Sequence, residues 1–216
     1  MRIVVLAGGL STEREVSISS GTLVAEALRS KGHEVVLLDV FMGYEENICD
    51  IDALFKQNYS FTDGNSIGDD VENTITNIKE AKENRLDKTS RYIGRNVIEI
   101  CSEADITFLA LHGGEGENGQ LQATLDLFGI KYTGSGYLGS ALAMNKGLTK
   151  SVFMQKNINT PSGELYKNEK DALAWNMFPC IVKPCSGGSS VGVSKVENAD
   201  PVSYTHLRAH ETRHDL

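Results

Sequence analysis

Apolar segments alternate with amphipathic segments along the chain in the order expected of an α/β protein. Short apolar runs at residues 3–6, 34–39 and 106–111 predict buried strands, because strands covered on both faces are nearly continuous in apolar side chains. Between the first two runs, residues 19–31 carry apolar side chains at helical spacing and stop at Gly32. A strand, a helix and a second strand in this order predict a right-handed β-α-β unit, and therefore a parallel sheet.

The alternation of apolar and amphipathic segments is weak between residues 41 and 95 and clear again after the third apolar run. Residues 61–77 are polar and rich in Asp, Asn and Gly, which predicts a surface loop, and residues 78–86 predict an exposed helix. No site is expected between residues 41 and 95. A helix at 119–128 and a strand at 130–133 follow the third apolar run.

From residue 144 the pattern changes to that of a hairpin. A helix is predicted at residues 146–155 and a strand at 178–184. Residues 186–190 form a Gly/Ser turn, and residues 191–196 read as the returning strand. We therefore predict a first domain of residues 1–143 and the start of a second domain at residues 144–200.

The last segment, residues 201–216, does not resemble the rest of the chain. Three of its histidines are spaced four residues apart and would share one helix face, which could suggest a metal site. These are His206, His210 and His214. We reject that interpretation, because the peptide resembles the translation of sequencing-adaptor DNA. Such a tail would not be part of the natural protein or of its fold. The alternative is a natural polar tail.

Composition narrows the class of protein. The net charge of −8 over 216 residues argues against a general binder of nucleic acids or anionic membranes. No apolar run approaches the length of a membrane span, and the N-terminus does not read as a signal peptide. The four cysteines match no zinc pattern, so they are expected to be reduced thiols in a cytoplasmic protein.

Two candidate motifs follow predicted strands, at the strand ends where open α/β sheets bind ligands. In the first, residues 8–17, Glu13 and Glu15 would suit a bound ammonium group. Alternatively, these acids only complement a helix dipole, and Ser17 or Ser19 caps the helix; composition does not decide between the two. In the second motif, His112 stands beside glycines that allow a ligand to approach the backbone, which favours a functional histidine over a structural one.

Two further motifs carry weaker signals. Residues 134–139 fit G-x-G-x-x-G, but the acid expected about 20 residues later is absent, so we interpret the stretch as a tight turn feeding the helix at Lys146. The alternative hypothesis is that this stretch binds a nicotinamide cofactor and that the protein is a nicotinamide-dependent dehydrogenase. Lys183, with the Gly/Ser loop at residues 186–192, can hold phosphates, although the loop is not a Walker A motif. The alternative is a solvent-exposed hairpin.

Taken in order, these motifs have a family pattern. They are Gly8-Gly9-x-Ser11-x-Glu13-Arg14-Glu15-Val16-Ser17, His112-Gly113-x-x-Gly116-Glu117-x-Gly119-x-Leu121-Gln122, Tyr132-Thr133-Gly134-Ser135-Gly136, Met144-Asn145-Lys146, and Val182-Lys183-Pro184 with Gly188-Ser189-Ser190-Val191-Gly192. The pattern resembles that of D-alanine–D-alanine ligases, from Arg2 to about Ala199. The resemblance implies a Rossmann-like parallel-sheet N-terminal (pre-ATP-grasp) domain, followed by the truncated start of an ATP-grasp domain.

The resemblance also implies a reaction and the roles of residues. ATP phosphorylates the carboxylate of one D-alanine, and the amine of a second D-alanine attacks the acyl phosphate, which gives a dipeptide for peptidoglycan synthesis. Glu13 would bind the ammonium group of the first D-alanine, His112 would lie near its carboxylate and the acyl phosphate, and Val16 would line its subsite. The candidate catalytic residues implied by the resemblance are Glu13, His112 and Ser189.

The ATP-contacting residues implied by the resemblance lie in the second domain. Lys146 and Lys183 would contact the phosphates. Ser189 and Ser190 would lie in the loop that closes over the reaction, with Ser189 ordering the substrate network. This chain has Ser186-Gly187 where many relatives carry larger or charged residues, a departure that concerns loop closure.

The resemblance implies further features that the chain itself does not carry. The ligands of Mg²⁺ (or Mn²⁺) would lie beyond Asp200, together with an oxyanion-stabilising arginine, so this polypeptide alone is expected to have no ligase activity. A homodimer is expected from the family. The alternatives are a D-alanine–D-lactate ligase and a non-catalytic, ligand-binding α/β remnant.

Overall fold

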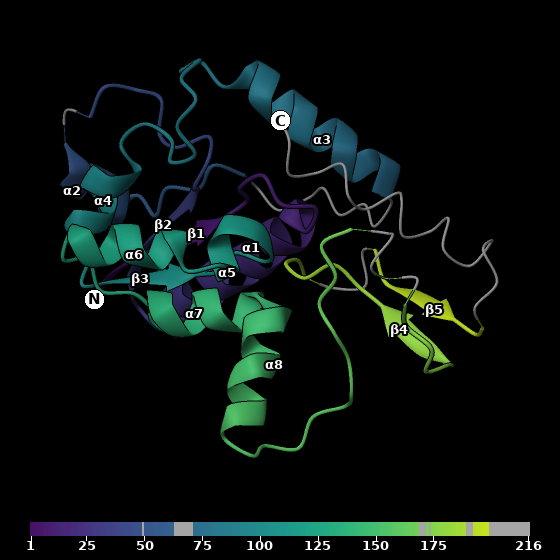
Figure 1. The fold of residues 1–216 in the computed structure, drawn as a ribbon. Coiled ribbons are helices and arrows are strands. Elements are labelled where there is room, and N and C mark those ends of the chain that lie inside the picture. The colour runs from purple at the N-terminus through teal and green to yellow at the C-terminus, as the bar shows by residue number, and fades with distance from the viewer. Residues whose placement is uncertain (49, 63–70, 169–171, 173, 189–191, 199–216) are drawn as a thin grey trace. The chain divides into compact units, whose positions relative to one another are not determined.

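The structure is a computed structural model that describes residues 1–216 except 49, 63–70, 169–171, 173, 189–191 and 199–216 (Figure 1). The chain divides into two compact units, Met1–Ala141 and Leu142–Leu216.

The first unit is built on a parallel sheet. Its strands are β1 (Arg2–Ala7), β2 (Glu34–Asp39) and β3 (Ile106–Leu109), in the order β2-β1-β3. Both pairings are parallel, with Ala7 opposite Asp39 and Leu6 opposite Leu109. The α/β class and the parallel β-α-β unit predicted from the apolar pattern are therefore confirmed.

The predicted strand at residues 130–133 is wrong. The segment forms only an isolated bridge between Thr107 and Tyr132. The N–H of Thr107 donates to the carbonyl of Lys131, and the carbonyl of Thr107 accepts from the N–H of Thr133. The N–H of Leu109, however, donates to the Thr133 hydroxyl at 3.1 Å instead of to a backbone carbonyl. The side-chain bond takes the place of the next ladder bond, so the pairing does not extend.

Alternation along the strands explains why both faces of the sheet are covered. Odd-numbered residues of β1 pack with α1 (Arg14–Ser30), and even-numbered residues pack in a second cluster with other helices of the first unit. The helices that contribute buried residues to the second cluster are α2 (Ile51–Lys56), α4 (Val97–Ser102) and α6 (Gln120–Leu127). Five of the six residues of β1 and of β2 are buried, which accounts for the continuous apolar runs of these two strands in the sequence.

Helix α1 begins five residues earlier than predicted. Its N-cap is Glu13, which makes no side-chain capping bond, so Ser17 and Ser19 lie inside the helix and do not cap it. At the other end Gly32 adopts a φ of +81°, and its N–H donates to the carbonyl of Arg29. Glycine reaches this left-handed conformation without a Cβ clash, which ends the helix where the sequence predicted.

The segment predicted as a loop and an exposed helix is different in the structure. Helix α3 runs from Val71 to Asn84, so residues 71–77 are helical. Val71, Ile75 and Ile78 have helical spacing, which the surrounding polar residues concealed. The exposure of the segment was also predicted wrongly in part, because Ala81 and Arg85 are buried.

The remaining short helices of the first part of the chain follow β3. They are α5 (Gly114–Glu117) and α7 (Tyr137–Met144), and α7 reaches across the division between the two units.

The second unit contains the helix and the hairpin that the sequence predicts. Helix α8 spans Lys146–Gln155, and strands β4 (Cys180–Val182) and β5 (Ser194–Val196) pair antiparallel. The strands are shorter than predicted, at three residues each. Among the described residues, no helix has the length and apolar character needed to cross a membrane.

Candidate functional site

Three serine hydroxyls join the turn after β1 and the first part of α1 to the end of β3 and the histidine motif. The Ser17 hydroxyl accepts from the N–H of Gly8 and donates to the carbonyl of Ala110, both at 2.9 Å. The Ser11 hydroxyl donates to the carbonyl of His112 at 2.5 Å. The Ser20 hydroxyl and His112 Nε2 form a hydrogen bond of 3.2 Å. Because β1 and β3 are parallel neighbours, these bonds lie where the carboxyl ends of the two strands meet.

The same contacts bring Glu13 to the histidine loop. Gly113 has a φ of +66° and a ψ of −179°, a conformation that suits glycine alone. A Cβ at Gly113 would lie only 2.6 Å from Glu13 Oε2, so the carboxylate lies directly against the Gly113 backbone. Two predicted residues, Glu13 and His112, are thus gathered at one edge of the sheet.

A buried ion pair holds the turn after β1. The Arg14 guanidinium pairs with the Asp39 carboxylate, and both side chains are almost completely inaccessible to water. Asp39 Oδ1 also accepts from the N–H groups of Gly9 at 3.2 Å and Phe41 at 2.8 Å. Arg14 donates to the Gly9 carbonyl at 2.6 Å, so the pair grips both backbone groups of Gly9. We call Arg14 and Asp39 the buried clamp.

Tyr92 is a neighbour of this turn that sequence reasoning missed, because it falls in the segment where no site was expected. A Cβ at Gly9 would lie 2.5 Å from the Tyr92 hydroxyl, and the hydroxyl also interacts with the backbone of Leu10. Burial and, to a smaller extent, the nearby Glu115 carboxylate raise the pKa of Tyr92. Its phenol is therefore neutral at physiological pH and helps to fill the space behind the turn.

Val16 is less closely connected to the others. It lies in the first turn of α1, and 48% of its surface is exposed. Among the described residues, no hydrogen bond or ion pair joins Val16 to Glu13 or His112. The role of Val16 in a substrate subsite therefore stays a prediction.

The second unit gathers one of the two predicted lysines onto the hairpin. Asn145 caps α8, with its side-chain oxygen accepting from the N–H of Leu148 at 3.0 Å. Lys146 Nζ donates to the carbonyl of Gly187 at 2.7 Å. Lys183 directly follows β4 and is exposed. Ser189 and Ser190 lie outside the described residues.

The glycine motif at residues 134–139 lacks the context of a dinucleotide fingerprint. It follows the isolated bridge at Tyr132 instead of a strand, and Gly139 already lies inside α7. Gly134 has a φ of +105°, as a tight turn requires. The turn feeds α7 first and not the helix at Lys146 directly, which corrects our prediction.

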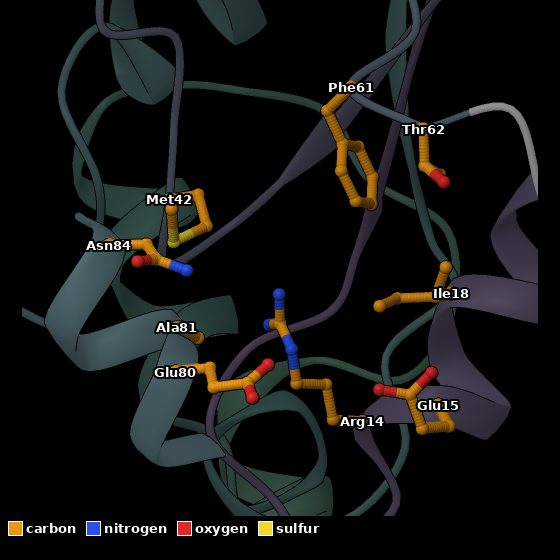
Figure 2. A pocket seen from close by; sticks show the side chains of 9 residues that line it. All are labelled: Arg14, Glu15, Ile18, Met42, Phe61, Thr62, Glu80, Ala81 and Asn84. Carbon is orange, nitrogen blue, oxygen red and sulfur yellow. The ribbon is translucent and has the colours of Figure 1, made fainter. Parts of the chain in front are cut away.

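A separate pocket of about 440 Å³ opens between α1 and α3 in the first unit. Figure 2 shows the Arg14 side chain extending from α1 toward the middle of this pocket, with Glu80 and Glu15 beside it. The lining residues are Arg14, Glu15, Ile18, Met42, Phe61, Thr62, Glu80, Ala81 and Asn84. Glu13, Val16 and His112 do not line it, so the pocket is distinct from the strand-end site.

Within the described part of the chain, no group of three or more His, Cys, Asp and Glu side chains is arranged to hold a metal ion.

Comparisons with known proteins show the family to which the chain belongs. Residues 2–135 match the family described as "D-ala D-ala ligase N-terminus", and residues 142–215 match "D-ala D-ala ligase C-terminus". The chain is 43% identical over 202 residues to the D-alanine–D-alanine ligase of Pediococcus pentosaceus, covering 92% of this chain and 56% of that protein. It is also 43% identical over 203 residues to the ligase of Lacticaseibacillus casei, covering 93% of this chain and 55% of that protein.

A solved structure of a relative shows the same fold. The D-alanine–D-alanine ligase of Bacillus anthracis complexed with ATP superposes with a TM-score of 0.58 and 27% identity, covering 98% of this chain and 52% of that one. The chain thus spans about half the length of the relatives it matches. Each of these relatives is a D-alanine–D-alanine ligase, so the D-lactate ligase and the non-catalytic remnant are not favoured. The matched regions and the gathered motifs together place this chain in the D-alanine–D-alanine ligase family.

Proposed function

We propose that this chain carries the first-substrate site and the phosphate-contacting elements of an ATP-dependent enzyme that joins two D-alanines. The observation that carries this proposal is the set of three serine hydroxyls, which bring the Glu13 and His112 motifs together at the ends of β1 and β3. The names of the relatives and the ATP complex of one of them support the reaction class.

In the proposed site, the first D-alanine is recognised through both of its charged groups. The Glu13 carboxylate accepts the ammonium group, and its place against Gly113 fixes where that group lies. The imidazole of His112, oriented by Ser20, lies near the substrate carboxylate. Side chains held by neighbours before substrate binds lose little conformational freedom on binding, which favours affinity and orientation.

The chemistry then proceeds in two displacements. A carboxylate oxygen of the first D-alanine attacks the γ-phosphorus of ATP, and ADP leaves with the electrons of the broken P–O bond. The amine of the second D-alanine attacks the acyl carbon, loses a proton, and inorganic phosphate leaves. Lys146 and Lys183 would offset the phosphate charge, which is the main requirement of such a transfer.

The proposal also includes a divalent metal ion. Mg²⁺, or Mn²⁺ in its place, would neutralise phosphate charge when bound, with ligands that family resemblance puts beyond Asp200. For this reason we expect the chain alone to release no phosphate from D-alanine and MgATP in a coupled assay. Steady release by the purified chain would contradict this expectation.

The cellular setting is proposed on the same basis. We propose a cytoplasmic, homodimeric enzyme of peptidoglycan synthesis that binds neither nucleic acid nor membrane. We also propose domains at residues 1–143 and 144–200, with residues 201–216 as a non-native tail; the whole of that tail, with its three histidines, lies outside the described residues.

Calorimetric titration of D-alanine into the chain tests the assignment of Glu13. Glu13→Ala should abolish the binding heat, because the ammonium group loses its counter-charge. The matched control is Glu15→Ala, which removes an acid two residues away that lines the separate pocket instead. Equal affinity for D-alanine in the wild type and Glu13→Ala would overturn the assignment.

A further inference from the structure

A set of contacts ties the start of α8 to the hairpin in the second unit. The backbone N–H of Lys146 donates to the carbonyl of Cys185 at 3.0 Å, and Lys146 Nζ donates to the carbonyl of Gly187 at 2.7 Å. The N–H of Gly187 approaches Met144 Sδ at 3.3 Å. We call these contacts, together with the bonds of the Asn145 side chain to Leu148 and Cys185, the hairpin clasp. It connects the segments that carry the two lysines of the proposed phosphate site.

Asn145 is the centre of the hairpin clasp. Its side-chain oxygen accepts from the N–H of Leu148 at 3.0 Å, which caps α8 and fixes the backbone immediately before Lys146. The same oxygen accepts from Cys185 Sγ at 3.1 Å, on the chain that leads from β4 into the Gly/Ser loop. One oxygen atom thus caps the start of the helix that begins with Lys146 and also accepts from Cys185, two residues after Lys183.

We propose that Asn145 is a positioning residue that couples Lys146 to the Lys183 hairpin, so that the two ammonium groups reach the phosphates of one nucleotide together. This inference rests on the proposed function, which assigns both lysines to ATP. Asn145 itself touches neither substrate nor nucleotide in this account. Its effect is to reduce the number of arrangements that the hairpin and the helix start adopt before the nucleotide binds.

The chemistry of the side chain explains why this residue type suits the position. An amide oxygen has two lone pairs, so it can accept from the Leu148 N–H and the Cys185 thiol at once. Serine would cap the helix as well as asparagine does, but its hydroxyl is too short to keep the thiol contact. Aspartate would keep both acceptor bonds. Alanine would lose both.

These differences give a direct test on the full chain, the rate at which iodoacetamide alkylates Cys185, resolved by peptide mass spectrometry. Asn145→Ser and Asn145→Ala should each speed the reaction about tenfold, the change expected for losing a thiol contact and, in the second case, a cap. Asn145→Asp should react no faster than the wild type, because it keeps the bonds and its negative charge disfavours the thiolate. Equal rates in all four proteins would overturn the coupling.

Two other cysteines control for loss of folding. Cys180 lies in β4 and makes no recorded contact with Asn145 among the described residues, so its rate should not change. Cys101 is buried in the first unit, where burial raises its pKa to about 12, and it should stay unreactive. Faster reaction at Cys180 together with Cys185 in Asn145→Ser would mean that the second unit had loosened as a whole, which would overturn the specific coupling.

Titration with ATP separates this inference from the proposed function. If both hold, the wild type and Asn145→Asp bind ATP, and Asn145→Ser binds it about tenfold more weakly, with D-alanine binding at the first unit unchanged. Equal ATP affinity in the wild type and Asn145→Ser would overturn the positioning role. Failure of the wild type to bind ATP would count against the proposed function, while the alkylation rates would still decide the coupling.

Discussion

The strand-end site of the first unit and the hairpin clasp of the second unit are built in opposite ways. Around the first, Arg14, Ser17 and Asp39 are buried; Ser17 and Asp39 each bond to more than one backbone group, and Arg14 bonds to the Gly9 carbonyl and pairs with Asp39. Around the second, no residue of α8 is buried, and Lys183 and Gly187 are exposed. Burial and multiple contacts favour a fixed arrangement, whereas exposed, sparsely packed elements open at low free energy.

The difference fits the two ligands that we propose. A small zwitterion offers few atoms for recognition, so its site gains from side chains that are already in place. A nucleotide phosphate chain is large and highly charged, and it can draw flexible lysines to itself. We therefore expect substitutions of the buried residues around the strand-end site to affect folding and D-alanine binding together, and those at the hairpin clasp to affect nucleotide binding and not D-alanine binding.

The largest effect is expected from breaking the buried clamp. Asp39→Ala leaves the buried Arg14 guanidinium without its partner, which should lower the free energy of unfolding by about 3–5 kcal/mol. Urea denaturation followed by circular dichroism measures this change. The control is Glu34→Ala, which breaks a partly exposed pair with Arg2 and should cost about 0–1 kcal/mol. Similar losses in the two variants would contradict the special role of the clamp.

A smaller effect is expected from adding one carbon beside Glu13. Gly113→Ala forces alanine into a backbone conformation that suits glycine and puts its Cβ against the Glu13 carboxylate, which should cost about 1–3 kcal/mol and displace that carboxylate. Thermal unfolding and D-alanine titration measure the two consequences. Gly129→Ala is the control, because its φ is also positive at +68° but its Cβ would meet open space. The comparison fails if both variants bind D-alanine equally well.

Alkaline pH should weaken the core of the first unit through Cys101. Burial raises the pKa of this thiol to about 12 in the folded protein, above its value in the unfolded chain. The neutral thiol is favoured by folding, so its contribution is complete below the unfolded pKa and is lost as pH rises toward 12. Unfolding free energies measured between pH 8 and about 10.5 should fall less steeply for Cys101→Ala than for the wild type. Identical slopes would contradict this account.

The smallest effect is expected at the histidine. Ser20→Ala removes the hydroxyl bonded to His112 Nε2, which should weaken D-alanine binding about fivefold, as expected for one hydrogen bond of about 1 kcal/mol. Ser30→Ala is the matched control, because its hydroxyl bonds only to the carbonyl of Ala27 at the far end of α1. If both substitutions leave D-alanine affinity unchanged, Ser20 does not orient the histidine for binding.

Much of the fold could be predicted because its signals are local. Continuous apolar runs identified three strands, two of them almost fully buried, and Gly32 correctly marked the end of α1. The start of α1 was missed because Arg14 and Ser17 look like surface residues in the sequence, whereas the structure buries both against strand ends. Polar composition in the same way concealed the first half of α3.

The candidate site could be predicted only as separate motifs. Glu13 and His112 stood out beside glycines after strands, but nothing local shows that Ser11, Ser17 and Ser20 would join them. Asp39 lies at the end of a predicted strand, where ligands bind, and this position was the one signal that could have drawn attention to it. Its partnership with Arg14 depends on the parallel pairing of β1 and β2, which is a tertiary property.

The most direct test of the account is an amide NMR titration of the chain with D-alanine and, separately, with L-alanine. We predict shifts at Gly9, Ser11 and Gly113 with D-alanine and much smaller shifts with L-alanine. Two of the contacts that distinguish the enantiomers are those to the ammonium and carboxylate groups, and we propose that the Val16 subsite supplies the third, to the methyl group. Equal responses to the two enantiomers, or shifts confined to Phe61 and Ala81 of the separate pocket, would contradict the claim that the strand-end site recognises D-alanine.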